Sequence, residues 1–215
     1  MQIRCYTLML SRFRHLHKKA KNEEIESSSS VKKVTFVLFA LFLLLFPHYA
    51  PFDNNAEASN SIVQTVFNLY FFISNQTLGI IHESGHGVCY ILHCPQFMTA
   101  ANGTVFQIGF PLGVAYYYRH RGNAFAYYIS LFFVGFSLTY TGWYIGTAHE
   151  GLHIPASKSF LGVDGNHDFN YILDSMGLLA YDGVISGLVK AGAYLCMLWA
   201  VIGMFLNVFE SRQQK

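Results

Sequence analysis

The sequence predicts an all-α, polytopic membrane helix bundle with about five transmembrane helices. Of its 215 residues 53% are hydrophobic and only 12% are charged, whereas soluble domains usually carry about a quarter charged residues. The charges are also unevenly placed, because eight of the fourteen lysines and arginines lie in residues 1–33. The chain therefore divides into a basic, flexible N-terminal tail (1–32) and an apolar transmembrane domain (33–210). The tail mixes charge signs and ends in a serine run, so it predicts a linker and no nucleic-acid partner.

Five apolar stretches predict the membrane-spanning helices. They run from Val34 to Phe46, Ile62 to about His93, Gly103 to Tyr118, Ala124 to about Thr147, and Val184 to Phe209. More than thirty residues precede the first stretch and no small-residue cleavage site follows it, so we expect an anchoring helix rather than a signal peptide. The second stretch is longer than a bilayer core of about 30 Å requires. We expect it to tilt, project or break, with SNQTLG (74–79) as the place for a break. A polar loop or cap (148–183) separates the last two stretches.

The orientation in the membrane follows from the distribution of cations. The positive-inside rule places the basic N-terminal tail in the cytoplasm. Five crossings would then put Arg119 and Arg121 outside, which the same rule disfavours. The larger excess of lysine and arginine in the N-terminal tail favours a cytoplasmic N-terminus. A miscounted span would also explain why Arg119 and Arg121 fall on the disfavoured side.

The motif with the clearest chemistry is His82-Glu83-Ser84-Gly85-His86, an HExxH sequence within the second apolar stretch. Two histidines four residues apart project from one face of a helix, about one turn apart, and can reach one zinc ion. Glu83 is then placed to accept a proton from water as a general base. Ionisable groups inside a membrane are costly, which favours this functional interpretation over a purely structural one.

A second HExxH sequence is His149-Glu150-Gly151-Leu152-His153. Ile154-Pro155 follows at once, and the residue before a proline is disfavoured in a helix. We therefore expect this motif at a fraying helix end in a polar loop, where its side chains are solvated.

A catalytic zinc site usually has three protein ligands. We rank His167 first as the third ligand, Asp168 second and Asp182 third, with Glu150 behind them. Asp182 has an ordinary alternative role, because aspartate before a helix is a common N-cap. Two amides are candidates for substrate binding: Gln107, which could instead bond a neighbouring helix, and Asn170.

Two resemblances extend this interpretation. A membrane-embedded HExGH with a later Asp-Gly resembles the site-2 protease class of intramembrane zinc metallopeptidases. That resemblance implies His82, His86 and Asp182 as zinc ligands and Glu83 as base, although this chain has AYDG where that class has an Asn-Pro-containing motif ending in Leu-Asp-Gly. Residues 62–208 also resemble a group of bacterial polytopic membrane proteins regarded as peptidase-like. Its motifs read here as His82 to His86, Gly103-Thr-Val-Phe106-Gln107, and His167-Asp168-Phe169-Asn170, with Phe in place of Trp.

The function that these features predict is a membrane-embedded zinc metallopeptidase that hydrolyses peptide bonds within or near the bilayer. Its partners would be the lipid bilayer and a membrane protein or peptide substrate. One alternative is a di-iron oxidase built on Glu83-x-x-His86 and Glu150-x-x-His153, which lacks the further glutamates that such bundles take from two other helices. Another is a non-catalytic metal-binding membrane protein or transporter. The sequence gives neither the substrate nor the oligomeric state.

Overall fold

The structure is a computed structural model of the chain, and it describes residues 29–49, 61–154 and 165–210. These residues are mostly helical, as predicted. Three helices are long and apolar enough to cross a membrane: Ser29–Tyr49, Ala124–Glu150 and Leu179–Phe209. The count of five such spans is not reached among the described residues, because α2 (Ile62–Leu92) and α3 (Gln96–His120) are long but less apolar. Most of the predicted N-terminal tail (1–32) lies outside the described residues.

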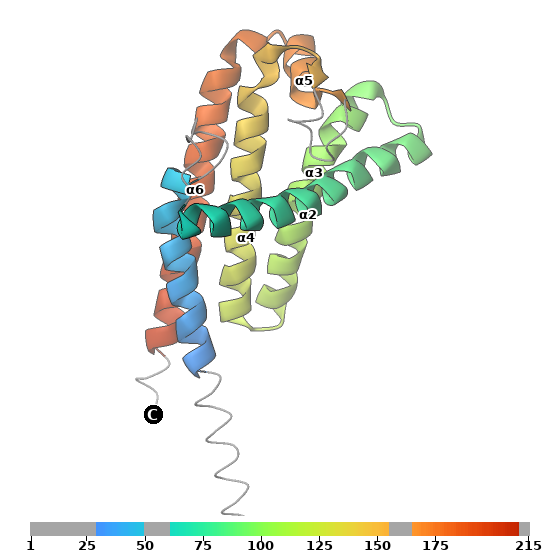
Figure 1. Ribbon diagram of the computed structural model, residues 1–215. Coiled ribbons are helices and arrows are strands. Elements are labelled where there is room, and N and C mark those ends of the chain that lie inside the picture. The colour runs from blue at the N-terminus through green and yellow to red at the C-terminus, as the bar shows by residue number, and fades with distance from the viewer. Residues whose placement is uncertain (1–28, 50–60, 155–164, 211–215) are drawn as a thin grey trace, which may run out of the picture.

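The elements follow one another in a simple order. After the N-terminal helix Ser29–Tyr49 come α2, α3 and α4 (Ala124–Gly146). The polar connection then holds η1 (Ala148–Glu150), β1 (His153–Ile154), β2 (Gly165–Asn166), α5 (Asp168–Ser175) and η2 (Leu179–Tyr181), and α6 (Asp182–Glu210) closes the chain. The two strands pair antiparallel, with His153 opposite Asn166. Figure 1 shows α5 and this connection gathered at one end of the bundle.

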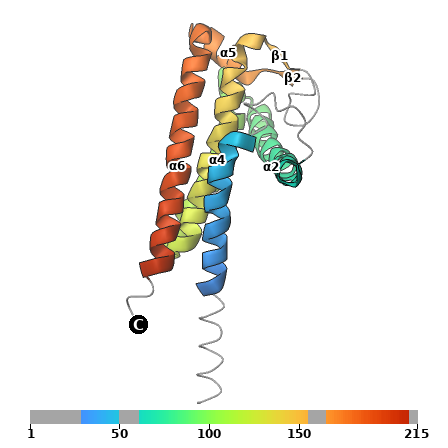
Figure 2. The same ribbon diagram turned by 60° about the vertical axis from the view of Figure 1, so that its left-hand side comes forward.

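The N-terminal helix, α4 and α6 pack along one another through aromatic side chains. The ring contacts are Phe36 to Phe205 at 5.6 Å, Phe39 to Phe132 at 4.6 Å and Phe46 to Tyr194 at 6.1 Å between centroids. A further contact, Phe46 to Phe136 at 5.8 Å, shows with Phe39 to Phe132 that the N-terminal helix runs parallel to α4. The contacts with Phe205 and Tyr194 show that it runs antiparallel to α6, and Figure 2 shows the three side by side. Burial of these large rings, at roughly 25 cal/mol per Å² of apolar surface, supplies the main packing energy here.

Helix α2 lies across this bundle rather than along it (Figure 1). The Tyr70 ring lies 5.5 Å from that of Phe136, and His82, one long segment later, is joined through Gln107 to Ser137. From residue 70 to 82 a helix advances about 18 Å, so Tyr70 contacts α4 directly while His82 reaches Ser137, the residue after Phe136, only through Gln107 of α3. The helix is continuous through 74–79, so the predicted break is wrong and the long stretch is accommodated by its tilt.

Helices α2 and α3 approach each other closely at a glycine. A Cβ atom added to Gly85 would lie 2.8 Å from the carbonyl carbon of Asn102 and 3.0 Å from the Cα of Gly103. The Asn102 side-chain amide also donates a 2.7 Å hydrogen bond to the Gly85 carbonyl. The glycine of the HExxH motif is therefore needed for helix packing.

We expect Gly85→Ala to destabilise the protein by about 1–3 kcal/mol, because the added methyl group would force two backbones apart. Gly87→Ala is the matched control, since a Cβ there meets nothing within 4 Å. Thermal unfolding of both detergent-purified variants, followed by circular dichroism, measures the difference. Equal unfolding temperatures for the two variants would contradict this account of the helix contact.

Candidate metal centre

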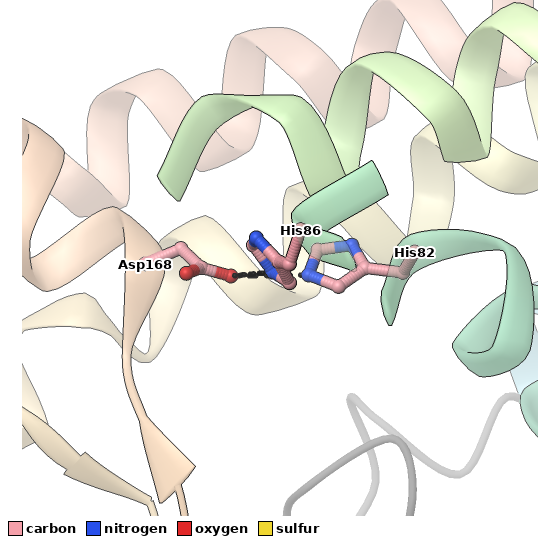
Figure 3. Close-up of side chains that lie close together, drawn as sticks. All are labelled: His82, His86 and Asp168. Carbon is pink, nitrogen blue, oxygen red and sulfur yellow. Dashed lines mark hydrogen bonds and ion pairs between the residues drawn. The ribbon is translucent and has the colours of Figure 1, made fainter. Parts of the chain in front are cut away.

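Three side chains from two distant segments converge on one point. His82 and His86 come from α2 and Asp168 from the first residue of α5, and their ligand atoms all lie within 4.8 Å of one another. The Asp168 Oδ2 atom is 3.0 Å from His82 Nε2 and 3.2 Å from His86 Nε2 (Figure 3). Within the part of the chain that the structure describes, this is the one group of three or more such residues that could hold a metal ion.

The hydrogen bonds of Gln107 fix the tautomer of His82. The Gln107 Nε2 atom donates to the carbonyl oxygen of Ser137 at 3.3 Å, and its Oε1 atom lies 3.2 Å from His82 Nδ1. Since a carbonyl oxygen can only accept, the amide nitrogen faces Ser137 and the amide oxygen faces the imidazole. His82 therefore carries its proton on Nδ1 and presents the lone pair of Nε2 to Asp168.

A backbone carbonyl of α3 fixes the tautomer of His86. Its Nδ1 atom lies 2.7 Å from the carbonyl oxygen of Thr99, so it donates a proton there and leaves the Nε2 lone pair free. Two lone pairs and a carboxylate oxygen then face one position. A proton would satisfy one of the two imidazole nitrogens, whereas a divalent cation satisfies both and the carboxylate, with ligand types that suit zinc.

Gly103 keeps that position open. A Cβ atom added there would lie 2.6 Å from the Nε2 atoms of both His82 and His86. Gly103 and Gln107 lie four residues apart and so share one face of α3. The Gly-x-x-Phe-Gln motif thus contributes space beneath the two imidazoles and the acceptor that orients one of them.

Tyr144 holds the Asp168 carboxylate in place. Its hydroxyl accepts a 3.1 Å hydrogen bond from the Asp168 backbone N–H and donates a 3.3 Å bond to Asp168 Oδ2. Burial by itself would raise the pKa of Asp168. When protons rather than a cation occupy the two Nε2 atoms, the hydrogen bonds that His82 and His86 donate outweigh burial and keep the pKa of Asp168 below its ordinary value. The sequence analysis missed Tyr144, because it is one of 14 tyrosines and belongs to no motif.

His167, ranked first as the third ligand, lies outside the group. It is the N-cap of α5, where its Nδ1 accepts from the Asn170 N–H at 3.4 Å and its Nε2 lies 3.1 Å from the Thr147 hydroxyl. Burial lowers the pKa of His167 to about 4, so the ring is neutral and Nε2 is the donor. Both nitrogens are engaged, and the geometry favours Asp168, the second-ranked residue, as the third ligand.

Asp182, ranked third, stabilises the start of α6 instead. Its Oδ1 accepts from the Gly183 N–H at 2.6 Å, while its Oδ2 accepts from the backbone N–H and the Nδ1–H of His149, at 3.1 and 2.6 Å. It does not belong to the metal-binding group. Asp182 lies at the helix start, but its helical dihedral angles (φ −52°, ψ −43°) are not those of the expected N-cap. Its placement also differs from the ligand role that the site-2 protease resemblance implies.

The second HExxH sequence is not helical as a unit, which confirms the expectation from Pro155. Glu150 ends η1, Gly151 has a φ of 120°, and His153 begins β1. A di-iron site would take its second Glu-x-x-His pair from a helix, so this placement disfavours the oxidase. Glu150 likewise does not belong to the metal-binding group.

The two amides predicted to bind substrate have structural partners. Gln107 is 1% exposed and bonds His82 and Ser137, as the helix-to-helix alternative requires. The side-chain amide of Asn170 donates a 2.8 Å bond to the Ala148 carbonyl, which fastens α5 to η1.

Glu83, the predicted base, is partly buried and follows His82 on α2. Its negative charge acts on both His86 and Tyr144. A general base is a group that accepts a proton without being a metal ligand, and Glu83 lies outside the three-residue group.

We expect Asp168→Asn to lower zinc affinity by more than the roughly 10–100-fold that loss of a partner behind a ligand costs. The amide keeps the shape of the side chain but removes its charge. His167→Ala should cost less, because that ring supports α5 without facing the metal, and Asp182→Asn should bind zinc as the natural chain does. Competition with a zinc chelator measures all three, and a larger loss for His167→Ala than for Asp168→Asn would contradict the assignment.

Gly103→Ala should also abolish zinc binding, because the methyl group would occupy the space between the two imidazoles. Gly109→Ala, on the same helix, is the control, since a Cβ there meets nothing within 4 Å. Zinc content after purification, measured by atomic spectroscopy, should fall to background for Gly103→Ala alone. Full zinc occupancy in that variant would show that the metal does not bind between these rings.

Comparison with known proteins adds no relative: no protein-family model matches the chain, and no curated protein or solved structure matches it either. The resemblance to site-2 proteases therefore stays a prediction that rests on the motifs. Residues from all three motifs of the second resemblance do meet at this centre, since His82, His86, Gly103, Gln107 and Asp168 surround one position.

Proposed function

We propose that the protein is a membrane-embedded zinc metallopeptidase with His82, His86 and Asp168 as zinc ligands. The observation that carries this proposal is the convergence of two Nε2 lone pairs and one carboxylate oxygen on a position that Gly103 leaves open. Two imidazoles and a carboxylate are a ligand set that catalytic zinc sites use, with one place left for water or substrate. Zinc bound there supplies Lewis acidity at the substrate carbonyl.

Glu83 supplies the proton transfers of hydrolysis. It takes a proton from the attacking water as the new C–O bond forms at the peptide carbonyl. It then delivers that proton to the amine nitrogen as the C–N bond breaks. Tyr144 acts through Asp168, whose carboxylate it holds in one orientation by two hydrogen bonds.

An apolar cavity of about 390 Å³ between α2, α3 and α4 supports a membrane peptide as the substrate. Two hydroxyls in its wall are satisfied within their own helices, Thr77 by the Ile73 carbonyl and Ser130 by that of Ala126. The wall also includes Ile81, which precedes His82. A cavity of this volume and polarity is suited to apolar side chains next to the bond that is cut.

The apolar helices fit the same proposal. Three helices have the length and composition of membrane spans, and the metal-binding residues pack against the second of these through Ser137 and Tyr144. The protein is thus a multi-pass membrane protein whose reaction takes place within or near the bilayer.

Glu83→Gln should retain zinc and lose peptide hydrolysis by about 10²–10⁴-fold, because the amide cannot accept the proton. His86→Ala, in contrast, should lose both the metal and the activity. Zinc analysis and cleavage of an apolar reporter peptide in detergent separate the two variants.

The number of metal ions per chain and the peptide-cleavage activity together decide between the candidate functions. One zinc per chain with cleavage that depends on Glu83 is the result expected of the peptidase. Two irons per chain would indicate an oxidase. One zinc with equal, background cleavage by the natural chain and Glu83→Gln would indicate a non-catalytic metal protein.

A further inference from the structure

Four of the five lysines and arginines among the described residues gather at one end of the helix bundle, and the fifth, Lys190, lies in α6 beside Gly142. The Lys32 ammonium lies 5.7 Å from the ring centroid of Phe125, in the first turn of α4. The turn between α3 and α4 carries Arg119 and Arg121, so these cations share an end with the start of the N-terminal helix. In the sequence Lys33 stands next to Lys32, and six further cations precede it. We call Lys32, Lys33, Arg119 and Arg121 the basic end.

Tyrosines surround these cations. The Arg119 guanidinium lies 5.5 Å from the Tyr127 ring, and that of Arg121 lies 5.3 Å from the Tyr117 ring. Tyr117 is 51% exposed. Tyrosine rings beside lysine and arginine are typical of the membrane–water interface, where the ring meets the hydrocarbon boundary and the cation meets headgroups.

The opposite end has the reverse charge. The described residues of the connection, 148–154 and 165–182, contain four acidic residues (Glu150, Asp168, Asp174 and Asp182) and no lysine or arginine. Asp168 belongs to the metal centre, and the Tyr144 that holds it lies in the last turn of α4. The metal centre is therefore on the side of the bundle away from the basic end (Figure 1).

The path of α2 removes the conflict over Arg119 and Arg121. When α2 is counted as a crossing, these residues fall on the side opposite the N-terminal tail. Because α2 lies across the bundle, four of the described helices pass along it: the N-terminal helix, α3, α4 and α6. The packing of Phe36 near Phe209, at 6.5 Å between ring centroids, puts the end of α6 at the basic end as well.

We propose that the basic end is an interaction surface for the anionic headgroups of the cytoplasmic leaflet, so that the metal centre faces the opposite side of the membrane. Lysine and arginine near a membrane surface are attracted to anionic lipids and are retained on the cytoplasmic side. This inference concerns orientation and lipid contact, and it does not depend on whether the metal centre is catalytic.

Cysteine labelling tests the orientation in the full-length chain. Ala124→Cys and Met176→Cys place exposed thiols at the two ends, in a background where Cys5, Cys89, Cys94 and Cys196 are alanine. A membrane-impermeant maleimide should label Met176→Cys in intact cells and Ala124→Cys only after permeabilisation. Labelling of both from one side, or the reverse pattern, would overturn the proposal. Epitopes inserted after Gly122 and after Gly177 of the natural chain give the same readout without loss of any cysteine.

Reconstitution tests the lipid contact. We expect the natural chain to unfold at a higher temperature in vesicles that contain phosphatidylglycerol than in vesicles of phosphatidylcholine alone. The double variant Arg119→Glu/Arg121→Glu should lose most of that shift, whereas Arg119→Lys/Arg121→Lys, which preserves the charge, should retain it. An equal shift in all three proteins would show that these residues do not contact the headgroups.

Discussion

The hydrogen-bonded series Ser137–Gln107–His82 is the interaction on which the arrangement depends. It joins α4, α3 and α2 in an interior where the side chains of Gln107 and Ser137 are almost completely buried. No water competes there, so each polar atom needs a protein partner, and the loss of one leaves another unsatisfied. The same bonds decide which nitrogen of His82 carries the proton. Helix packing and the tautomer of His82 are therefore set by one group of contacts, which explains why a glutamine lies at this buried position of α3.

The part of the centre that the sequence predicted is the part that local geometry determines. His82 and His86 are one helical turn apart, so a helix alone places their imidazoles on one side. The third position depends on tertiary contacts that no spacing rule supplies. His167 and Asp168 are neighbours, and the N-cap conformation of His167 turns its ring toward Thr147 while Asp168 meets the imidazoles. Tyr144 belongs to no motif. It holds the Asp168 carboxylate only because α4 packs against α5.

The span count shows what composition can and cannot predict. The apolar stretches in the N-terminal helix, α4 and α6 were found correctly, because length and hydropathy are properties of the sequence. The direction of a helix is not a property of its composition. Helix α2 is long enough to span a membrane, yet it lies across the other helices. Helix α3 is less apolar, and three of the residues that lower its hydropathy, Asn102, Gly103 and Gln107, contact α2 and build the centre.

If the centre binds its proposed metal, the eight-residue length of α5 would link metal supply to the lifetime of the protein. A helix this short is marginal by itself, and its first residue bonds a histidine 86 positions earlier in the chain. An ion bound by both segments would act as a removable crosslink and add about 4 kcal/mol to the stability at 1,000 times its Kd. Chains without the ion would expose α5 to proteases more often, which limited proteolysis with and without chelator can measure. The amount of intact protein in a cell would then follow the free metal concentration, independently of any change in synthesis.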